Sequence, residues 1–331
     1  MLNLPSPSKS LARLRGRDFE VLAVLGSLGA LLAFLVVVPL VLVLWFSFRS
    51  GGPTEDGGLT LQNYRDTFLN PLTYELMVNT LVFSFGSIIV GLIIGVGFAW
   101  LFERTDTPLR NFGFVTVVLN SAMPAALFAI AWVLVLNPRT GLINLPFTMW
   151  LGWDKGPFTP HNLISMIVVE GLRLSATIFL MVIGLFRSMD PALEEASSMS
   201  QVGTLKTARH VTLPIMVPGL LGVVIYVATS TIGTFEIPGV MGMPADIHVL
   251  ATRIFVATTQ TPADYGFATS LATIAGILGI VGIWLYHHVT KIQARFATVT
   301  GKGFRPRRIM LSKRGKFISV SLIFLFFFFG I

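Results

Sequence analysis

Long apolar runs, separated by short charged segments, cover most of the chain. A transmembrane helix needs about 20 mostly apolar residues, and six runs within residues 21–290 reach that length. These runs are Val21–Phe48, Leu76–Phe102, Phe112–Leu136, Asn162–Phe186, Ile215–Phe235 and Phe267–Thr290. The pattern therefore predicts an all-α, polytopic membrane protein with a domain of six transmembrane helices at residues 21–290.

A seventh apolar run, Phe317–Ile331, follows a basic cytoplasmic linker at residues 291–316. As a helix it would cross only about 22 Å, which is less than the roughly 30 Å of a bilayer core. We interpret it as a partial seventh span, which is either naturally short or the first part of a longer chain. Its phenylalanines between Phe324 and Phe329 are expected to face lipid.

The composition supports a membrane protein and excludes several soluble classes. Hydrophobic residues make up 53% of the 331 residues and charged residues only 12%, whereas a soluble protein has about 25% charged residues. A net charge of +8 would suggest nucleic acid in a soluble protein. Here the basic residues lie in gaps between apolar runs, so we expect contact with membrane lipid and no nucleic acid. The absence of cysteine excludes a disulfide-stapled secreted domain.

The distribution of Lys and Arg predicts how the chain crosses the membrane. Eighteen of the 24 Lys and Arg residues lie in the N-terminal segment 1–20 and in alternate gaps, and cytoplasmic loops carry such an excess. We therefore predict a multi-pass protein of a bacterial-type cytoplasmic (inner) membrane, with a cytoplasmic N-terminus. The other gaps are long and rich in Gly, Pro and Asn, and we expect them to form outside loops with short interfacial helices.

The cytoplasmic gap at residues 187–214 has the pattern of two short helices. Asp190 is a good N-cap and Pro191 suits the first helical position. Glu194 and Glu195 then lie near the positive end of that helix dipole. Such an exposed element can insert into a groove on a soluble partner, although an ordinary solvated loop would fit the same residues.

The same segment resembles the EAA loop of binding-protein-dependent ABC importer permeases. That family's pattern is Glu-Ala-Ala, three residues, Gly, nine residues, Ile, any residue and Leu-Pro. The matching positions here are Glu195, Ala196, Ser197, Gln201, Val211, Leu213 and Pro214. Ser197 replaces the second Ala, and Gln201 replaces the glycine at which the chain turns between the two helices. Gly203 is a candidate to take over that turn, because glycine adopts positive φ at little cost.

The resemblance extends over residues 20–290 and implies the methionine-permease-like fold. Further local features resemble the ferric-iron-type branch of these permeases, in which one polypeptide often holds two six-span halves in tandem. A second half beginning at Phe317 would make the chain a truncated tandem permease. The features are Arg187–Pro191, Phe235–Pro238, Gly242–Pro244 and Val249–Ile254.

The family resemblance also implies partners. The loop would be the coupling helix that docks on a cytoplasmic ABC ATPase dimer, with roles for Asp190, Glu194, Glu195, Ala196, Ser197, Gln201, Gly203, Val211, Leu213 and Pro214. An extracytoplasmic substrate-binding protein would deliver the solute, and a second permease half, a copy or another chain, would complete the pore. The chain has no Gly-rich phosphate-binding loop. We therefore expect no enzyme activity and no bound cofactor, with ATP used by the partner ATPase.

Several polar residues within the apolar runs are candidates for a translocation path. Glu170 and Arg173 are three residues apart, so on a helix they share a face and can pair. Alternatively, the fourth span begins near Leu172 and leaves both residues at the outer interface. The remaining candidates are Asn120, Ser121, Thr231 and Glu236. No metal site is expected, since His287 and His288 lack further ligands at suitable spacing.

The sequence thus predicts an ABC importer permease, with ferric iron as the cargo implied by the resemblance. Permeases of this type also carry polyamines, phosphonates, thiamine or sulfate. Two other functions stay open. An ion-gradient-driven secondary carrier would need intramembrane ionisable residues, for which Glu170 and Arg173 are the candidates. A truncated, inactive permease would explain Gln201 and the short last run.

Overall fold

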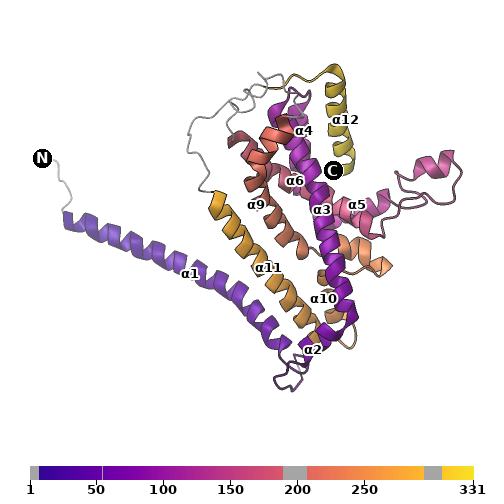
Figure 1. Ribbon diagram of the computed structural model, residues 1–331. Helices are drawn as coiled ribbons and strands as arrows, with labels where there is room; N and C mark the ends of the chain where they lie inside the picture. The colour runs from indigo at the N-terminus through magenta and orange to yellow at the C-terminus, as the bar shows by residue number, and fades with distance from the viewer. Residues whose placement is uncertain (1–6, 54, 189–206, 294–307) are drawn as a thin grey trace.

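The computed structural model describes residues 7–53, 55–188, 207–293 and 308–331, and all regular elements among them are helical (Figure 1). The helices are α1 (Pro7–Ser47), α2 (Gln62–Leu69), α3 (Pro71–Arg104), α4 (Arg110–Ala122), α5 (Ala125–Val135), η1 (Pro146–Trp150), α6 (Leu163–Ser188), η2 (Ala208–Thr212), α9 (Leu213–Ile232), η3 (Pro238–Gly242), η4 (Met243–Ala245), α10 (Leu250–Thr259), α11 (Tyr265–Gln293) and α12 (Lys313–Gly330). The all-α prediction is therefore confirmed.

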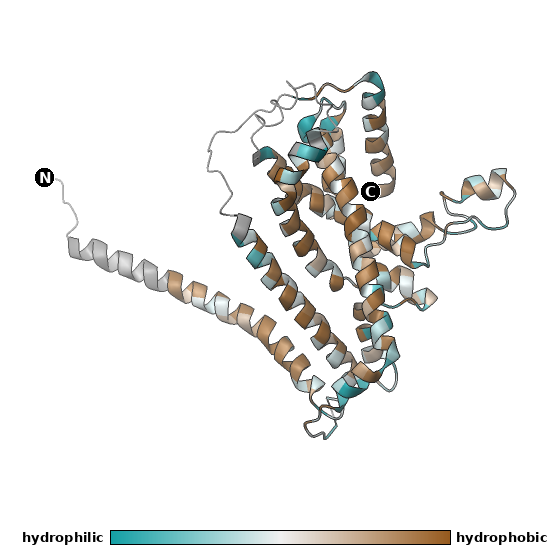
Figure 2. Cartoon of the chain, in the orientation of Figure 1, coloured by the Kyte–Doolittle hydropathy of each residue, from teal (hydrophilic) through white to brown (hydrophobic). Residues whose placement is uncertain are grey.

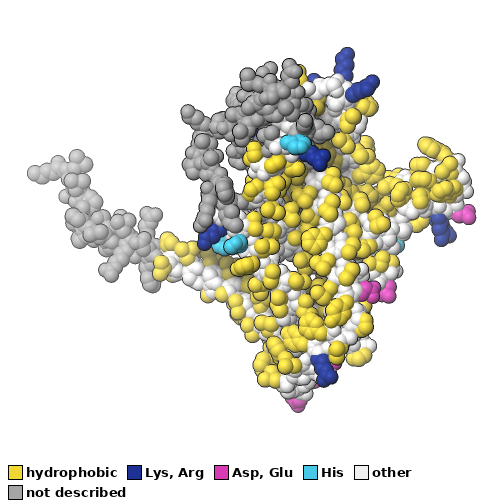
Figure 3. Space-filling view, in the orientation of Figure 1, with side chains coloured by type: hydrophobic (Ala, Val, Ile, Leu, Met, Phe, Trp, Pro, Cys, Tyr) yellow, Lys and Arg dark blue, Asp and Glu magenta, His cyan; other side chains and the backbone are white. Residues whose placement is uncertain are grey.

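Five helices in the described part of the chain are long and apolar enough to cross a membrane. They are residues Val21–Ser47 of α1, together with α3, α6, α9 and α11, and they correspond to five of the six predicted spans. Figure 2 shows that hydrophobic residues dominate along these helices. On the face seen in Figure 3, apolar side chains cover the bundle and charged side chains lie at its margins. The lengths and composition support the predicted membrane crossings.

The predicted third span is wrong as a single helix. Residues Phe112–Leu136 instead form α4 and α5, whose axes are bent by 107° at a break between them. Pro124 lacks a backbone N–H and disfavours helical geometry in the residue before it. Met123 accordingly adopts extended backbone angles (φ −74°, ψ 130°). A second bent pair, with an angle of 71°, joins residues 238–245 to α10.

Helices α3 and α6 form the centre of the bundle and run in the same direction. Glycines on α3 allow the close contact: a Cβ atom at Gly95 would lie 2.6 Å from the Ser175 carbonyl oxygen, and one at Gly91 would lie 2.9 Å from Ile178. The buried side chains around them include Phe102 and Phe179, which meet edge to face. This core fixes the relative position of the two helices.

Helix α1 runs away from the rest of the bundle (Figure 1). Its apolar segment Val21–Ser47 has no buried residues in its most hydrophobic stretch. Side chains hold its C-terminal end: the Tyr64 hydroxyl is 2.7 Å from the Ser47 hydroxyl, and the Phe48 and Tyr64 rings are 5.1 Å apart. The long apolar surface of α1 is therefore available to lipid or to another membrane protein.

Helix α12 packs on the bundle, beside α4, and corrects one expectation. Phe326 is 5% exposed and its ring lies 5.1 Å from Phe98, so this phenylalanine does not face lipid. Phe328 is 72% exposed, as expected. The reason is helical periodicity, because residues two apart lie on different faces of a helix. At the end of α12, the Asn120 side-chain amide donates to the Gly330 carbonyl.

Candidate functional site

The predicted coupling loop is partly outside the described residues. Its acidic helix and turn fall there, namely Asp190, Glu194, Glu195, Ala196, Ser197, Gln201 and Gly203. The structure does describe the two ends of the loop, which we call the coupling roots. The first root is Phe186–Ser188 at the end of α6, and the second is η2 with the first turn of α9.

Two neighbouring charged residues of α3 hold the first coupling root. The Glu103 carboxylate accepts from Arg187 Nε at 3.1 Å and from its NH2 group at 2.9 Å. Arg104 is buried, donates to the Phe186 carbonyl at 3.0 Å, and lies 5.7 Å from the centre of the Phe186 ring. A displacement of the first root therefore acts directly on the end of α3.

The second coupling root begins a helix with proline in its first turn. Leu213 and Pro214 form the first turn of α9, which follows the π-helical turn η2 directly. Val211 lies in η2. Leu213 and Pro214 are both exposed, so this Leu-Pro pair lies at the surface of the bundle and not in its core.

A groove lies between the two coupling roots, and we call it the root groove. It has a volume of about 260 Å³. Its walls come from α3, α6 and the second root, and include Gly97, Trp100, Phe186, Arg209, Leu213 and Met216. Because both roots line it, the two ends of the coupling loop lie close together in space.

The turn after α3 binds the segment before α12, a feature that the sequence analysis missed. The Asp106 carboxylate accepts the Leu311 N–H at 2.7 Å and lies 2.6 Å from Lys316 Nζ. The backbones of Thr105 and Ile309 form a short parallel bridge. Hydrogen bonding from the Leu311 N–H, and then from Lys316, holds the pKa of Asp106 below its usual range. Asp106 is one of the acidic residues that follow the second apolar run, and this was the sequence feature from which the contact could have been suspected.

Glu170 and Arg173 form an ion pair inside α6. Arg173 Nε is 2.9 Å from Glu170 Oε2, and its NH2 group is 2.6 Å from Oε1. The Glu170 side chain is fully buried, whereas that of Arg173 is 27% exposed. Helix α6 begins at Leu163, so both residues lie within one continuous helix, and the alternative of a membrane span that begins near Leu172 stays a prediction. Within the pair each charge neutralises the other, and both residues lie inside the continuous helix α6.

The other path candidates differ in their surroundings. Glu236 is exposed and close enough to act electrostatically on both Glu170 and Arg173. Asn120 and Thr231 are buried, and the Thr231 hydroxyl donates to the Val227 carbonyl of its own helix. The Ser121 hydroxyl donates to the Val118 carbonyl. Glu236 is thus within electrostatic range of the ion pair, and none of the four forms a hydrogen bond or an ion pair with it in the described part of the chain.

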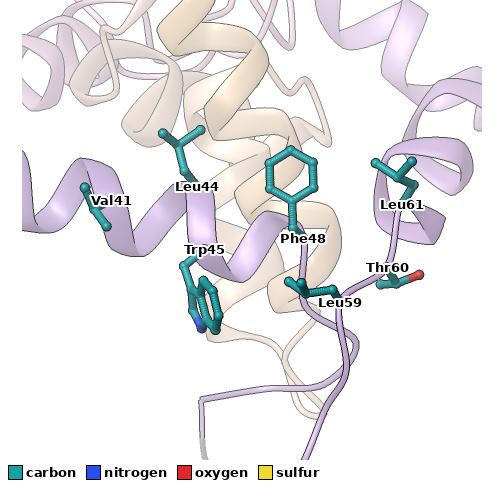
Figure 4. A pocket seen from close by; sticks show the side chains of 7 residues that line it. All are labelled: Val41, Leu44, Trp45, Phe48, Leu59, Thr60 and Leu61. Atoms are coloured by element: carbon teal, nitrogen blue, oxygen red, sulfur yellow. The ribbon is translucent and has the colours of Figure 1, made fainter.

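An apolar hollow at the C-terminal end of α1 lacks the chemistry of a solute site (Figure 4). It has a volume of about 660 Å³ and is lined by Leu44, Trp45, Phe48 and residues 59–61, with Thr60 as its polar member. A solute site needs convergent polar groups.

The described part of the chain contains no group of three or more His, Asp or Glu side chains placed to hold a metal ion.

Comparison with known proteins places this geometry in a family. Residues 87–295 match the model of the binding-protein-dependent transport system inner membrane component. The putative ferric transport system permease protein FbpB 1 of Haemophilus influenzae is 24% identical over 305 residues, covering 89% of this chain and 46% of that protein. The sulfoquinovosyl glycerol transport system permease protein SmoG of Agrobacterium fabrum is 22% identical over 278 residues, covering 80% and 87%.

A solved structure shares the fold. It is a bacterial alginate ABC transporter in complex with an alginate pentasaccharide-bound periplasmic protein, with 18% identity and a TM-score of 0.67 over 87% of this chain and 98% of the matched chain. The chain spans less than half the length of the ferric transport relatives that it matches. Because the family model covers the bundle from α3 to α11, including both coupling roots, the chain belongs to the binding-protein-dependent transport system inner membrane components.

Proposed function

We propose that the chain is a membrane-spanning permease part of an ATP-driven ABC importer. The observation that carries the proposal is the family match over residues 87–295, which includes a cytoplasmic-type loop whose two roots meet at one groove. In this proposal the chain binds no nucleotide. A separate cytoplasmic ATPase dimer docks on residues 187–214 and hydrolyses ATP.

The contacts at the first coupling root support a route for mechanical coupling. Glu103 and Arg104 join the root to α3, and α3 packs along α6 through Gly91 and Gly95. The ATP-closed form of the ATPase binds one arrangement of the loop better than another, and this difference shifts the population of the helix bundle. We propose that the solute path runs beside Arg173 and Glu236, with the buried Glu170 holding Arg173 in position.

The partners follow from the same proposal. An extracytoplasmic binding protein delivers solute to the outside loops, and a second permease half, of the same or another chain, completes the pore. The parallel course of α3 and α6 supports an alternating topology, because the chain must cross the membrane twice between their starts. The excess of Lys and Arg in the N-terminal segment and the alternate gaps supports a cytoplasmic N-terminus. The N-terminal segment then lies on the ATPase side.

Ferric iron is the proposed cargo. It is supported by the ferric transport relatives, each about a quarter identical or less, while the sulfoquinovosyl glycerol permease is similarly distant. Uptake of radioactive ferric iron by cells that express the chain with its genetic neighbours tests the cargo. Uptake of iron that does not depend on the chain would contradict this part of the proposal without affecting the coupling assignment.

Substitution of Glu195 tests the coupling assignment. Glu195→Lys reverses a charge on the proposed docking helix, and we expect it to abolish co-purification of the ATPase with the chain from solubilised membranes. Glu75→Lys is the matched control, because Glu75 is exposed near the opposite end of α3. Unchanged recovery of the ATPase with Glu195→Lys would remove the assignment of this loop.

A further inference from the structure

The root groove contains open space beside Gly97 of α3. A Cβ atom at Gly97 would meet no atom within 4 Å. By contrast, Gly91 and Gly95 on the same helix face α6 at contact distance. Gly97 therefore leaves space beside α3 instead of allowing helix contact, and that space is part of the root groove.

The groove combines an apolar wall with one cationic side chain. Trp100, Phe186, Leu213 and Met216 provide apolar surface. Arg209 lines the groove, is exposed, and has no recorded acidic partner within the described ranges. A solute such as a sugar would require several converging polar groups, and the groove does not offer them.

The position of the groove along the helices indicates which layer of the membrane it meets. It lies at the ends of α3 and α6, where Arg104 bonds the Phe186 carbonyl. In the topology of the proposed function, on which this inference rests, that level is the cytoplasmic headgroup region. Basic pockets between transmembrane helices on the cytoplasmic side bind anionic lipid headgroups.

We infer that the root groove binds an anionic phospholipid of the cytoplasmic leaflet. Its phosphate lies against the Arg209 guanidinium, and an acyl chain lies along Gly97 between Trp100 and Met216. A lipid in this position contacts both coupling roots. Its binding and the position of the coupling loop are therefore linked through the Phe186 wall.

Native mass spectrometry of the purified full chain tests the inference. The protein is titrated in detergent with phosphatidylglycerol and, separately, with phosphatidylcholine. We expect Arg209→Gln to weaken phosphatidylglycerol binding about five-fold, the effect of one cation near a lipid headgroup, and to leave phosphatidylcholine binding unchanged. Gly97→Leu fills the groove, and we expect it to weaken binding of both lipids.

Two matched variants serve as controls. Gly184→Leu adds the same side chain on α6 where a Cβ also meets no atom within 4 Å, outside the residues that line the groove. Arg139→Gln removes an exposed charge on an outside loop. Both should bind the two lipids like the original chain.

Equal phosphatidylglycerol binding by the original chain, Arg209→Gln and Gly97→Leu would overturn the inference. Disappearance of a dimer from the mass spectrum of Gly97→Leu would also overturn it, because this would show that a second copy of the chain, and not a lipid, occupies the groove. These measurements contain no ATPase. A failure of lipid binding is therefore distinct from a failure of the proposed function, which the Glu195→Lys co-purification tests.

Discussion

At the residue scale, the buried Glu170 is accommodated in an apolar helix because Arg173 neutralises its charge. A charge placed in a low-dielectric interior is costly unless it is paired and hydrogen-bonded. Arg173 engages both oxygens of the buried Glu170 carboxylate. Because that carboxylate is occupied, the pair offers no free acid to bind a coupling ion, and no observation favours the secondary carrier. The spacing predicted the pair, but not its burial.

Asp106 provides a prediction about pH at the C-terminal end of α3. Folding lowers the pKa of this carboxyl. Its contribution to stability is therefore fully present above the ordinary pKa of an aspartate, and it is lost as the pH falls through the lower pKa of the folded protein. A spin label on Lys313→Cys, in a chain without native cysteine, should stay immobile from neutral pH down to about 4 and become mobile below that.

Neutralising the same carboxyl should release the segment at neutral pH. Asp106→Asn removes the ion pair with Lys316, and we expect the label at residue 313 to be mobile at pH 7 in this variant. Asp246→Asn, which changes a fully exposed acid far along the chain, should leave the spectrum unchanged. Identical spectra for Asp106→Asn and the original chain would show that Asp106 does not hold this segment.

At the element scale, the glycines of α3 serve two purposes that the sequence does not distinguish. Gly91 and Gly95 form a small-xxx-small pair of the kind that brings membrane helices together, and here they contact α6. Gly97 lies only two residues further and faces open space. The helical repeat separates these faces, so only the packed structure shows which glycine is needed for contact.

A methyl group at Gly95 tests the contact between α3 and α6. In Gly95→Ala the Cβ would lie 2.6 Å from the Ser175 carbonyl oxygen. We expect the helices to separate and the free energy of unfolding to fall by about 1–3 kcal/mol, the usual cost of overpacking. Chemical unfolding followed by tryptophan fluorescence measures this. Gly97→Ala is the control with open space, and a similar loss in both variants would contradict the assignment.

At the scale of the whole molecule, the ends of the helices alternate as membrane topology requires. The ends of α3 and α6 meet through Glu103 and Arg187, and α4 begins beside them, with Arg110 3.6 Å from Glu103. At the opposite end of the bundle, residues that follow α1 contact the start of α11, since Gly52 lies against Tyr265. Figure 1 shows these two ends on opposite sides of the bundle.

Cysteine labelling tests this arrangement in cells. The chain has no cysteine, so single introduced thiols report without background. Gly58→Cys, where a Cβ meets no atom within 4 Å, should react with a membrane-impermeant maleimide in intact cells. Ser197→Cys should react only after lysis. Labelling of Ser197→Cys from outside would reverse the topology and exclude ATPase docking at this loop.

The sequence alone determined the presence and approximate bounds of five long apolar helices, because a membrane-spanning helix requires about 20 apolar residues whatever its neighbours are. It also indicated the family through the spacing of the loop between Glu195 and Pro214. Tertiary structure decided the break at Pro124, the burial of Phe326 and the contacts of Asp106 with Leu311 and Lys316. These depend on which helices pack together, and hydropathy carries no information about that choice when nearly every face is apolar.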